Sequence, residues 1–317
     1  MGIEQLKVFA PASTGNLSVG FDALGLALAP VDGSLLGDVV SLSNSNARDW
    51  RLEVRGPFAT ALPEDPEENV VMTCCRRFEA TARNHMDDIS PLDVTLEKRL
   101  PVGSGLGSSA SSIVATLVAL NQWHGRPLNR LQLLSLMAEA EGGISGAVHL
   151  DNIAPSLLGG LRLCMPGSAQ QEGLPWPGGW QIVIAWPGSR LDTRAARLVL
   201  PEKLKLETVV AHGAQFARFV HALHAGDTRT AASCIHDLIA EPYRERLLPG
   251  FAEAREALPG LGALAVGISG SGPTIFSIVN DSQVARDVAQ WLKAHYCQTP
   301  EGFVHVCRAD LAGARPV

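Results

Sequence analysis

A segment rich in glycine and serine, PVGSGLGSSASS at residues 101–112, has the composition of a phosphate-binding loop. Glycines at alternate positions let the backbone turn sharply and approach a ligand without collisions from Cβ atoms. The serines that follow place hydroxyl groups and free backbone N–H groups at the start of an apolar helix predicted for residues 110–120. Unpaired N–H donors and the positive end of the helix dipole attract anions. A glycine turn capped by serines would explain the same residues without a ligand, but the strand–loop–helix context favours phosphate binding.

Several other phosphate-binding and catalytic motifs do not occur in the sequence. There is no G-x-x-x-x-G-K-[ST] pattern of a Walker loop, and the G-x-G-x-G spacing at 103–107 differs from the G-x-G-x-x-G of dinucleotide-binding folds. Neither H-R-D nor D-F-G occurs, so the signature of a protein kinase is missing. The G-x-S-x-G elbow expected of many serine hydrolases does not occur either.

The elements that must position the loop alternate between strands and helices in the first half of the chain. Residues 92–100 alternate between apolar and polar types, which predicts a strand that leads into the loop. Apolar residues at three- and four-residue spacing predict a helix over 68–85. A further helix is expected to begin at Asn129, where Gln132 completes a capping box, and to stop at the glycine pair 142–143.

A stretch rich in glycine and proline at residues 166–179 reads as a loop or linker near a domain boundary. The sequence is therefore divided into an N-terminal domain at 1–165 and a C-terminal domain at 166–317. Strands and helices alternate in both parts, and some strands are adjacent in sequence, which indicates the α+β class. In the C-terminal part we expect strands at 181–186, 264–268, 274–279 and 303–307, and helices at 204–225, 227–239 and around 284–292.

Composition narrows the class of protein. Of the 317 residues, 46% are hydrophobic and 18% are charged, which predicts packed globular domains. The net charge is −6 and the basic residues are scattered, which argues against a nucleic-acid partner because such binding needs clustered positive charge. No apolar stretch is long enough to span a bilayer or to serve as a signal peptide, so a cytoplasmic protein is expected. The six cysteines form no C-x-x-C pair, and no zinc site is expected from them.

Two further segments accompany the loop, one on either side of it. They are APASTGNLSVGFDALGLAL at residues 10–28 and GISGSGPT at residues 267–274. With these three motifs in this order, the chain resembles the GHMP kinase superfamily, and within it most closely the homoserine kinases, along almost its whole length. The resemblance implies a ribosomal-protein-S5-like N-terminal domain, a ferredoxin-like C-terminal domain and a homodimer. It also implies phosphorylation of the side-chain hydroxyl of L-homoserine in threonine biosynthesis, with ATP and Mg²⁺.

The resemblance also assigns residues to the nucleotide and the metal. Mg²⁺ prefers oxygen ligands and keeps several waters, and the family pattern places it on Ser109 and Glu141, with Ser108 as an alternative that the sequence does not separate. Asn69 matches a contact on the adenine side, although capping of a helix would explain the same residue. The residues expected to bind ATP are Asn69, Pro101, Val102, Gly103, Ser104, Gly105, Leu106, Gly107, Ser108, Ser109, Ala110 and Ser111.

Homoserine is a zwitterion, so its site should offer cations for the carboxylate and an acid for the ammonium. Arg197 and Arg244 match the carboxylate-binding positions of homoserine kinases, and arginine binds carboxylates in a bidentate way. Asp22 is the best partner for the ammonium, while Arg194 and Arg246 read as solvated surface charges. The substrate contacts implied are Asn16, Asp22, Asp151, Asn152, Arg197 and Arg244, and the catalytic group comprises Asn152, Ser109 and Glu141.

The sequence leaves open whether a general base takes part, and it leaves two other functions possible beside homoserine phosphorylation. Some members of the superfamily use an aspartate to accept the alcohol proton, but this chain has Asn152 at the corresponding place, with Asp151 beside it. We therefore predict transfer without a dedicated general base. A kinase for another alcohol, such as mevalonate or a sugar, is a second possible function. A sensor that binds ATP or an amino acid without turnover is a third, although it would have no need to keep Glu141 and both arginines.

Overall fold

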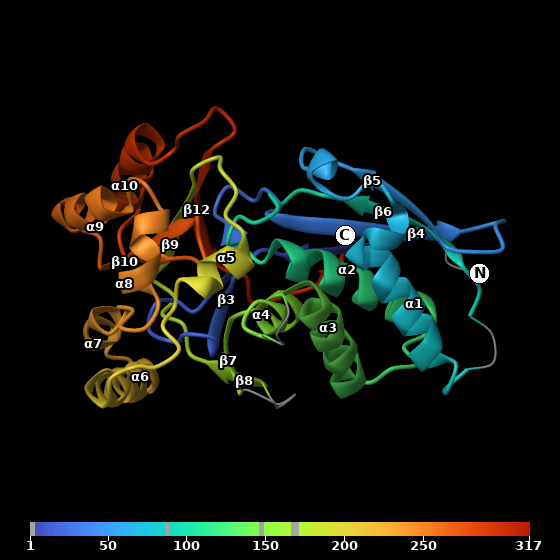
Figure 1. Cartoon of the computed structure of the whole chain (residues 1–317), viewed down its shortest axis with the longest axis horizontal. Coiled ribbons are helices and arrows are strands. Elements are labelled where there is room, and N and C mark those ends of the chain that lie inside the picture. Colours follow the sequence, from blue (N-terminus) through green and yellow to red (C-terminus); the bar gives the residue numbers. More distant parts are fainter. Residues whose placement is uncertain (1–3, 87–88, 146–148, 166–170) are drawn as a thin grey trace.

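The chain folds around two β-sheets that lie side by side, as the computed structural model shows (Figure 1). The structure describes residues 4–86, 89–145, 149–165 and 171–317. Helices and strands are mixed throughout, which confirms the predicted α+β class. None of the helices in these ranges is both long and apolar enough to cross a bilayer.

The first sheet carries the strand β6 (Leu92–Glu97) that leads into the glycine loop at residues 101–107. Neighbouring strands in this sheet are antiparallel, except for β5 and β6, which are parallel. Helices α1 (Val70–Ala82), α2 (Ser108–Trp123) and α3 (Arg130–Ser145) cover one face of it, and their apolar sides form one core with the strands (Figure 1). The strand order is β13 (Arg315–Pro316), β1 (Gln5–Pro11), β4 (Gly37–Asn44), β6 (Leu92–Glu97) and β5 (Arg51–Arg55).

The second sheet joins strands from both halves of the chain. Strands β3 and β7 of the first half lie beside β12 of the second half, so the two predicted domains share this sheet. The predicted boundary at 165/166 falls next to residues outside the described ranges and stays a prediction. The strand order is β10 (Ala265–Ile268), β11 (Ile275–Val279), β9 (Gln181–Trp186), β12 (Phe303–Ala309), β3 (Leu24–Pro30), β7 (Leu161–Cys164) and β8 (Gln171–Leu174), with β2 (Ser13–Gly15) paired to β3.

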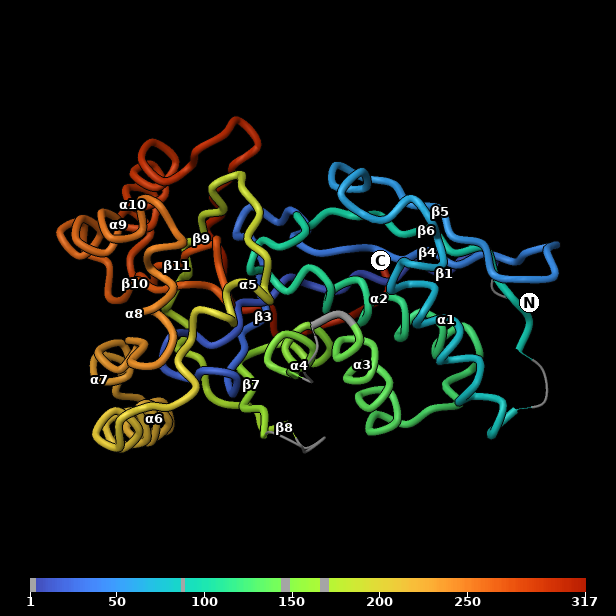
Figure 2. Tube along the Cα trace, viewed as in Figure 1, coloured from blue at the N-terminus to red at the C-terminus, as the bar shows by residue number. Residues whose placement is uncertain are grey.

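Helices cover both faces of the second sheet because both faces are apolar. Successive residues of a strand point to opposite faces, so one strand can contribute side chains to two cores. Ile182 and Ile184 of β9 belong to a core with α6 (Leu206–Ala225) and α7 (Thr228–Ser233), whereas Val183 and Ala185 pack against α9 (Phe251–Ala257) and α10 (Ser282–His295). Figure 2 shows these two helix pairs on opposite sides of the strands. The remaining short elements are α4 (Ile153–Leu158), α5 (Thr193–Leu198), α8 (Glu241–Arg244) and the 3₁₀ turns at Ala59–Ala61, Pro66–Glu68, Glu245–Leu247 and Leu258–Leu261.

The predicted capping box of α3 is confirmed, but the predicted end of that helix is wrong. The Asn129 carboxamide oxygen accepts hydrogen bonds from the N–H groups of residues 131 and 132, and the Gln132 side chain accepts one from the Asn129 N–H. The helix then runs through the glycine pair 142–143 to Ser145. A glycine inside a helix weakens it by only about 1 kcal/mol, which packing against neighbouring helices can outweigh.

The helix predicted at 227–239 is also shorter than expected, because α7 ends at Ser233. A few residues later the carboxylate of Asp237 accepts hydrogen bonds from the N–H groups of Ile239, Ala240 and Glu241. Side-chain acceptors of this kind compete with helical hydrogen bonds, so they end one helix and favour the start of the next. The segment therefore turns toward α8, which carries Arg244.

Candidate active site

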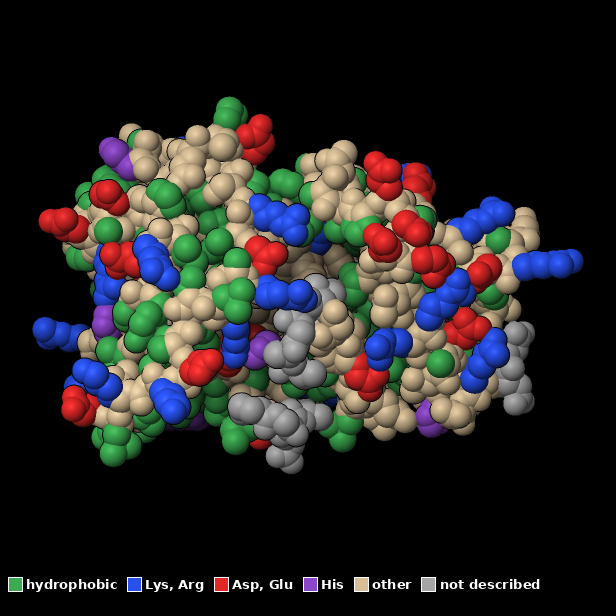
Figure 3. All heavy atoms as spheres, viewed as in Figure 1, with side chains coloured by type: hydrophobic (Ala, Val, Ile, Leu, Met, Phe, Trp, Pro, Cys, Tyr) green, Lys and Arg blue, Asp and Glu red, His purple; other side chains and the backbone are tan. Residues whose placement is uncertain are grey.

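A cavity of about 570 Å³ lies between the two halves of the molecule, and residues of both halves line it. Its size is within the range that holds a small ligand. The space-filling view shows the surface hollowed between the two halves, with basic and acidic side chains on its border (Figure 3). The loop that precedes α2 lines the cavity, and so do Asp22, Arg197 and Arg244.

The glycines of the loop adopt backbone conformations that other residues avoid. Gly103, Gly105 and Gly107 have φ angles of 66°, 81° and 65°. A Cβ atom on Gly105 would lie 2.4 Å from the backbone oxygen of Ser269, so the third sequence motif packs directly on the loop. The Ser269 hydroxyl also donates a hydrogen bond of 2.7 Å to the Gly105 carbonyl. The loop thus has no space for side chains at these positions, and its shape is fixed by a segment far along the chain.

The first sequence motif meets the other two at the same place. Asn16 donates from its Nδ2 to the Gly270 carbonyl at 3.0 Å and accepts from the Asp22 N–H at 2.8 Å. Asn16, Leu17 and Ser18 are three successive non-glycine residues with positive φ angles of 66°, 45° and 59°. Such conformations are strained for L-residues and are typical of functional sites. Asn16 therefore connects the strained turn to the Gly270 loop and places Asp22 in the cavity.

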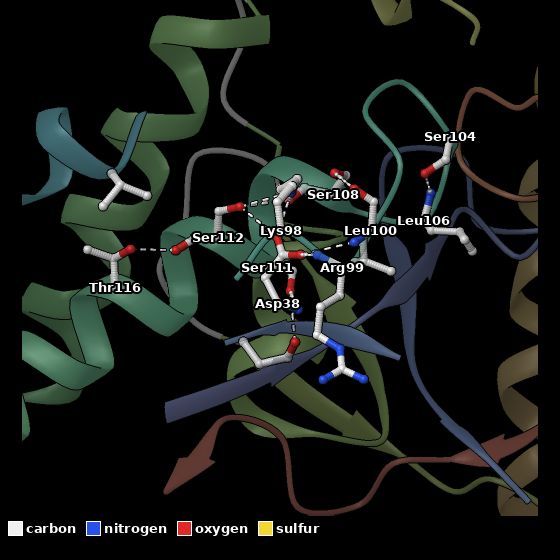
Figure 4. Close-up of polar contacts among 12 residues, drawn as sticks. Asp38, Lys98, Arg99, Leu100, Ser104, Leu106, Ser108, Ser111, Ser112 and Thr116 are labelled. Atoms are coloured by element: carbon white, nitrogen blue, oxygen red, sulfur yellow. Dashed lines mark hydrogen bonds and ion pairs between the residues drawn. The ribbon is translucent and has the colours of Figure 1, made fainter. Parts of the chain in front are cut away.

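A buried ion pair, Lys98 with Asp38, holds the residues on either side of the loop. The Lys98 ammonium bonds the Asp38 carboxylate at 2.5 Å, the Ser108 carbonyl at 2.8 Å and the Ser112 hydroxyl at 3.0 Å, which uses its three protons. Asp38 also accepts the backbone N–H groups of Arg99 and residue 100, just before the loop. Figure 4 shows this network between the end of β6 and the first turn of α2. The network holds both ends of the loop to the start of β4.

Ser109 and Glu141 meet at the first turn of α2, on the wall of the cavity. The Ser109 hydroxyl donates a hydrogen bond of 3.2 Å to Oε1 of Glu141, so the two oxygens lie where one cation could contact both. Burial raises the pKa of the Glu141 carboxyl, and the bond from Ser109 opposes that rise. A hydroxyl and a carboxylate are the oxygen ligands that Mg²⁺ takes in nucleotide sites, where phosphates and water complete the shell. Within the described ranges no group of three or more His, Cys, Asp or Glu side chains could hold a metal by itself.

An ion pair on the wall of the same cavity joins Asp22 to Arg197. The guanidinium donates two hydrogen bonds to the carboxylate, at 3.0 and 2.7 Å, and the side chains are 45% and 25% exposed for Arg197 and Asp22. His149 Nδ1 lies 3.7 Å from Asp22. Burial lowers the pKa of His149, and the charge of Asp22 opposes that shift. This part of the cavity wall therefore holds exposed, exchangeable charges of both signs.

Arg244 provides a second cation that is held much more firmly. Its side chain is 4% exposed, and it donates hydrogen bonds of 3.1 Å to the carbonyls of Ala196 and Gly270. The guanidinium groups of Arg197 and Arg244 lie 5.5 and 5.6 Å from the centre of the Phe21 ring. Stacking on one aromatic ring brings the two cations together, and cation–π attraction offsets part of their repulsion.

Asp151 and Asn152 also line the cavity, close to Gly15. A Cβ on Gly15 would be 2.3 Å from Oδ2 of Asp151 and 2.9 Å from Nδ2 of Asn152, so only glycine leaves space for them. Burial, the charge of Asp22 and the charge of Glu141 raise the pKa of Asp151 to about 7. The Asp151 carboxyl is therefore protonated below about pH 7 and ionised above it.

Comparisons with known proteins agree with this geometry. The sequence matches the GHMP kinase N-terminal domain over residues 69–160 and the GHMP kinase C-terminal domain over residues 219–297. The chain belongs to the GHMP kinase family. The crystal structure of homoserine kinase from Cytophaga hutchinsonii is 33% identical to this GHMP kinase, with a TM-score of 0.89 over 99% of this chain and 98% of that one.

More distant structures share the fold of this GHMP kinase. L. major mevalonate kinase, in complex with R-mevalonate, is 15% identical and has a TM-score of 0.68 over 96% of each chain. The mevalonate diphosphate decarboxylase of Enterococcus faecalis is 14% identical, with a TM-score of 0.65 over 99% of this chain and 98% of that one. At such low identity the likeness concerns the fold alone.

The structure brings most of the predicted site residues of this GHMP kinase together around one cavity. Asn69 caps α1 through its carboxamide oxygen, as its alternative explanation had it, and also borders the cavity beside Leu62 and Pro63. The predicted residues that line the cavity are Asn16, Asp22, Asn69, Val102, Gly103, Ser104, Gly105, Gly107, Ser108, Ser109, Glu141, Asp151, Asn152, Arg197 and Arg244.

Four residues of the predicted loop lie behind the cavity wall. The Ser111 hydroxyl points away from the cavity and donates to the Ala10 carbonyl at 2.8 Å. Pro101, Leu106 and Ala110 are buried in the cores around the loop. Arg194, which was expected to be a solvated surface charge, is exposed but borders the mouth of the cavity.

Sequence reasoning missed the support of the site more than the site itself. Lys98 follows β6, in which buried and half-buried residues alternate, and it occupies the next inward position. A lysine at an inward position of an alternating strand signals a buried partner, but the identity of that partner, Asp38, is decided by strand pairing. Ser13, whose hydroxyl contacts Asn152, carries no such signal in the sequence.

Proposed function

We propose that this GHMP kinase transfers the γ-phosphoryl group of ATP to the side-chain hydroxyl of L-homoserine, forming O-phospho-L-homoserine in threonine biosynthesis. One observation carries the proposal: a single cavity is lined both by a glycine loop with a helix start and by a carboxylate with two guanidinium groups. The loop and helix start, which we call the nucleotide end of the proposed site, suit phosphates, and the charged groups, which we call its amino-acid end, suit the two charges of an amino acid. The similarity to homoserine kinase from C. hutchinsonii along almost the whole of both chains supports this substrate.

At the amino-acid end, the substrate would exchange partners with the ion pair that is already there. The ammonium group of homoserine would take the place of Arg197 beside Asp22. Arg197, which is half-exposed, would then turn its guanidinium toward the substrate carboxylate, next to the fixed Arg244. An alcohol without both charges would leave one of these groups unpaired, and an unpaired group in a partly buried site is unfavourable.

At the nucleotide end, the phosphates would lie on the loop and at the start of α2. Phosphoryl transfer depends mainly on positioning and on stabilising negative charge, and this wall of the cavity provides backbone donors for both. Ser109 and Glu141 would hold Mg²⁺, which when bound neutralises charge on the phosphates. Asn69 would lie on the adenine side together with Leu62 and Pro63.

We further propose that transfer needs no dedicated general base. The γ-phosphate itself would accept the proton of the hydroxyl, with Asn152 beside the reacting group. The competing assignment is Asp151, whose raised pKa of about 7 is the kind a general base needs. An Asp151→Asn variant with normal homoserine binding would decide: a loss of kcat below about 10-fold supports the proposal, while a loss above about 100-fold identifies Asp151 as the base.

The test of the function is a substrate panel. ADP release is measured with ATP and Mg²⁺ on homoserine, threonine, serine, mevalonate and galactose. Turnover that depends on homoserine is the expected result. Turnover on mevalonate or galactose alone would keep the kinase activity and reject the substrate. Binding of ATP without turnover on any alcohol would favour the sensor.

We also propose a homodimer, which the resemblance implies, and a cytoplasmic location, which rests on the sequence pattern alone. Light scattering at micromolar protein concentration would test the dimer, for which a mass near twice 33.6 kDa is expected. A mass near 33.6 kDa would reject it.

A further inference from the structure

We propose that Ser13 is a positioning residue that turns the Asn152 carboxamide so that its NH₂ group, not its oxygen, faces the phosphoryl group in flight. The inference builds on the proposed phosphoryl transfer and adds to it a residue that holds the polar group at the reaction centre. It requires no particular alcohol as the acceptor.

Asn152 stands where an asparagine normally caps a helix, but its side chain does something else. It is the residue before α4, and within the described part of the chain its side chain accepts no N–H of that helix. Asparagine is among the residues most favoured at this position because its oxygen can accept such a bond. A residue that gives up a favourable local bond is often held elsewhere for function.

The side chain is held instead by Ser13, which is 139 residues away in sequence. The Ser13 hydroxyl lies 2.9 Å from Oδ1 of Asn152 and 3.3 Å from the Asn152 backbone oxygen. It is fully buried, and its own backbone N–H donates to the Leu106 carbonyl of the phosphate-binding loop. Ser13 therefore connects the loop, strand β2 and the start of α4.

The surrounding glycines show how closely this contact is packed. A Cβ on Gly107, the last residue before α2, would be 2.4 Å from the Ser13 hydroxyl oxygen and 3.0 Å from Oδ1 of Asn152. A Cβ on Gly15 would be 2.9 Å from Nδ2 of Asn152. Two glycines thus leave space for the carboxamide from opposite sides, one next to its oxygen and one next to its nitrogen. The side chain has little freedom to turn.

The bond from Ser13 decides which atom of the carboxamide is presented. Ser13 has one hydroxyl proton to donate, and Oδ1 of Asn152, at 2.9 Å, is a closer acceptor for it than the Asn152 backbone oxygen at 3.3 Å. Nδ2 donates no hydrogen bond within the described ranges and lies above Gly15, where Oδ2 of Asp151 also lies. A carboxylate attracts the NH₂ side of an amide and repels its oxygen side. Both contacts therefore favour the orientation in which Nδ2, and not Oδ1, is left to donate to a ligand in the cavity that Asn152 lines.

A donor at this position would act where negative charge grows during the reaction. In phosphoryl transfer that charge is spread over the oxygens of the moving group, and a donor fixed in advance stabilises it without reorganisation. Without Ser13 the carboxamide could rotate and present its oxygen, which would repel those oxygens. Ser13 thus acts through Asn152 and touches neither substrate.

A double-mutant cycle in kcat tests the inference, with whichever alcohol the wild-type enzyme phosphorylates. Ser13→Ala is expected to lower kcat roughly 10-fold, the worth of one hydrogen bond, with both KM values within about twofold. Asn152→Ala is expected to lower kcat about 100-fold or more. In the Asn152→Ala background, Ser13→Ala should change kcat by less than about twofold, since its partner is gone. Additive losses would overturn the inference.

Two further variants separate positioning from general stability and fix the orientation of the amide. Ser156→Ala is the matched control, because Ser156 lies in α4, directly after Asn152 and residues 153–155, is as buried as Ser13, and its hydroxyl donates to the Pro11 carbonyl at 2.8 Å. It should lower thermal stability as Ser13→Ala does and leave kcat within about twofold. Asn152→Asp keeps the acceptor for Ser13 but replaces the NH₂ by an oxygen. It should be at least as slow as Asn152→Ala, and near-normal turnover would overturn the inference.

The same cycle on thermal unfolding needs no substrate and separates this inference from the proposed function. A coupling between Ser13 and Asn152 in unfolding is expected whether or not the protein phosphorylates homoserine. Coupling in unfolding together with turnover on mevalonate or galactose would reject the substrate and keep the inference, provided the kcat cycle with that alcohol also shows coupling. Absence of coupling in unfolding would overturn the inference even if homoserine is the substrate. Coupling in unfolding without coupling in kcat would also overturn it, because Ser13 would then have a structural role only.

Discussion

The cavity is bordered by two ion pairs that differ in almost every respect. Beside the glycine loop, Lys98 and Asp38 are 2% and 0% exposed, and each has several further hydrogen-bond partners. In the proposed amino-acid site, Arg197 and Asp22 are 45% and 25% exposed, and their contact consists of two parallel hydrogen bonds. Both pairs have short, well-formed contacts, so geometry alone does not separate their roles. Burial does.

A buried pair and a half-exposed pair respond differently to loss of one partner. Removing one charge of a buried pair leaves the other without water or a counter-ion, which is strongly unfavourable. Removing one charge of an exposed pair changes stability little, since water solvates what remains. The Lys98–Asp38 pair is therefore part of the architecture of the loop, whereas the Arg197–Asp22 pair is free to exchange its partners for the charges of a ligand.

The largest expected effect is that of breaking the buried pair. Lys98→Met should lower the free energy of unfolding by about 3 kcal/mol, because it strands the Asp38 carboxylate beneath the loop. Urea unfolding followed by circular dichroism would measure this. Arg99→Met is the matched control, since the neighbouring Arg99–Glu97 pair is partly exposed and should contribute under about 1 kcal/mol. Equal losses in the two variants would contradict the comparison.

Breaking the exposed pair should affect binding and leave folding nearly unchanged. Arg197→Met is expected to raise KM for homoserine by about 10- to 100-fold, which corresponds to one charged hydrogen bond to the substrate. The free energy of unfolding should change by under about 1 kcal/mol. Steady-state kinetics and urea unfolding on the same preparation would test both. Arg246→Met, an exposed arginine outside the cavity, should change neither. A loss of stability as large as that of Lys98→Met would show that the two pairs do not differ.

A third prediction concerns Asp151, which lies between the two pairs. Its folded-state pKa of about 7 lies above the ordinary value of 3.8, so the folded protein binds this proton more tightly than the unfolded chain does. The stability it contributes is present below about pH 4 and is lost as the pH rises toward 7. The stability of Asp151→Asn relative to wild type should therefore increase between pH 5 and 7, by up to about 1.4 kcal/mol per pH unit.

Chemical unfolding at a series of pH values would measure this difference. Asp281→Asn is a control of opposite sign, because backbone N–H groups at the start of α10 lower the pKa of Asp281, whose stabilising effect is lost only as the pH falls below about 4. A constant difference between wild type and Asp151→Asn from pH 5 to 7 would contradict the raised pKa.

The smallest expected effect is that of salt. Raising NaCl from about 0.05 to about 0.5 M shortens the range of electrostatic attraction to a few ångströms in water, and exposed charges feel this most. KM for homoserine should rise a few-fold over that range, while the difference in unfolding between wild type and Lys98→Met should stay within about 0.5 kcal/mol. If the Lys98→Met difference shrank markedly with salt, the Lys98–Asp38 pair would have to be reached by solvent.

Local sequence patterns predicted much of the fold. The alternating residues of β6, the glycine loop and the capping box at Asn129 and Gln132 each leave a signal within a few neighbouring residues, and the structure has each of these elements where the pattern indicated. The ends of α3 and α7 were less predictable. At one end packing overrode a glycine pair, and at the other the side chain of Asp237 captured the backbone.

By itself, the sequence determined the glycine loop and the helix start that we propose bind phosphate, because positive φ angles and free N–H groups at a helix start are consequences of the local chain. Only the tertiary structure decided what holds that site together. The pairing of Lys98 with Asp38, the bond from Ser13 to Asn152 and the place of β3 beside β12 join residues 60 to almost 300 positions apart. Such contacts leave no periodic trace in the sequence, since each is selected by the packing of whole sheets and helices and not by its own neighbours along the chain.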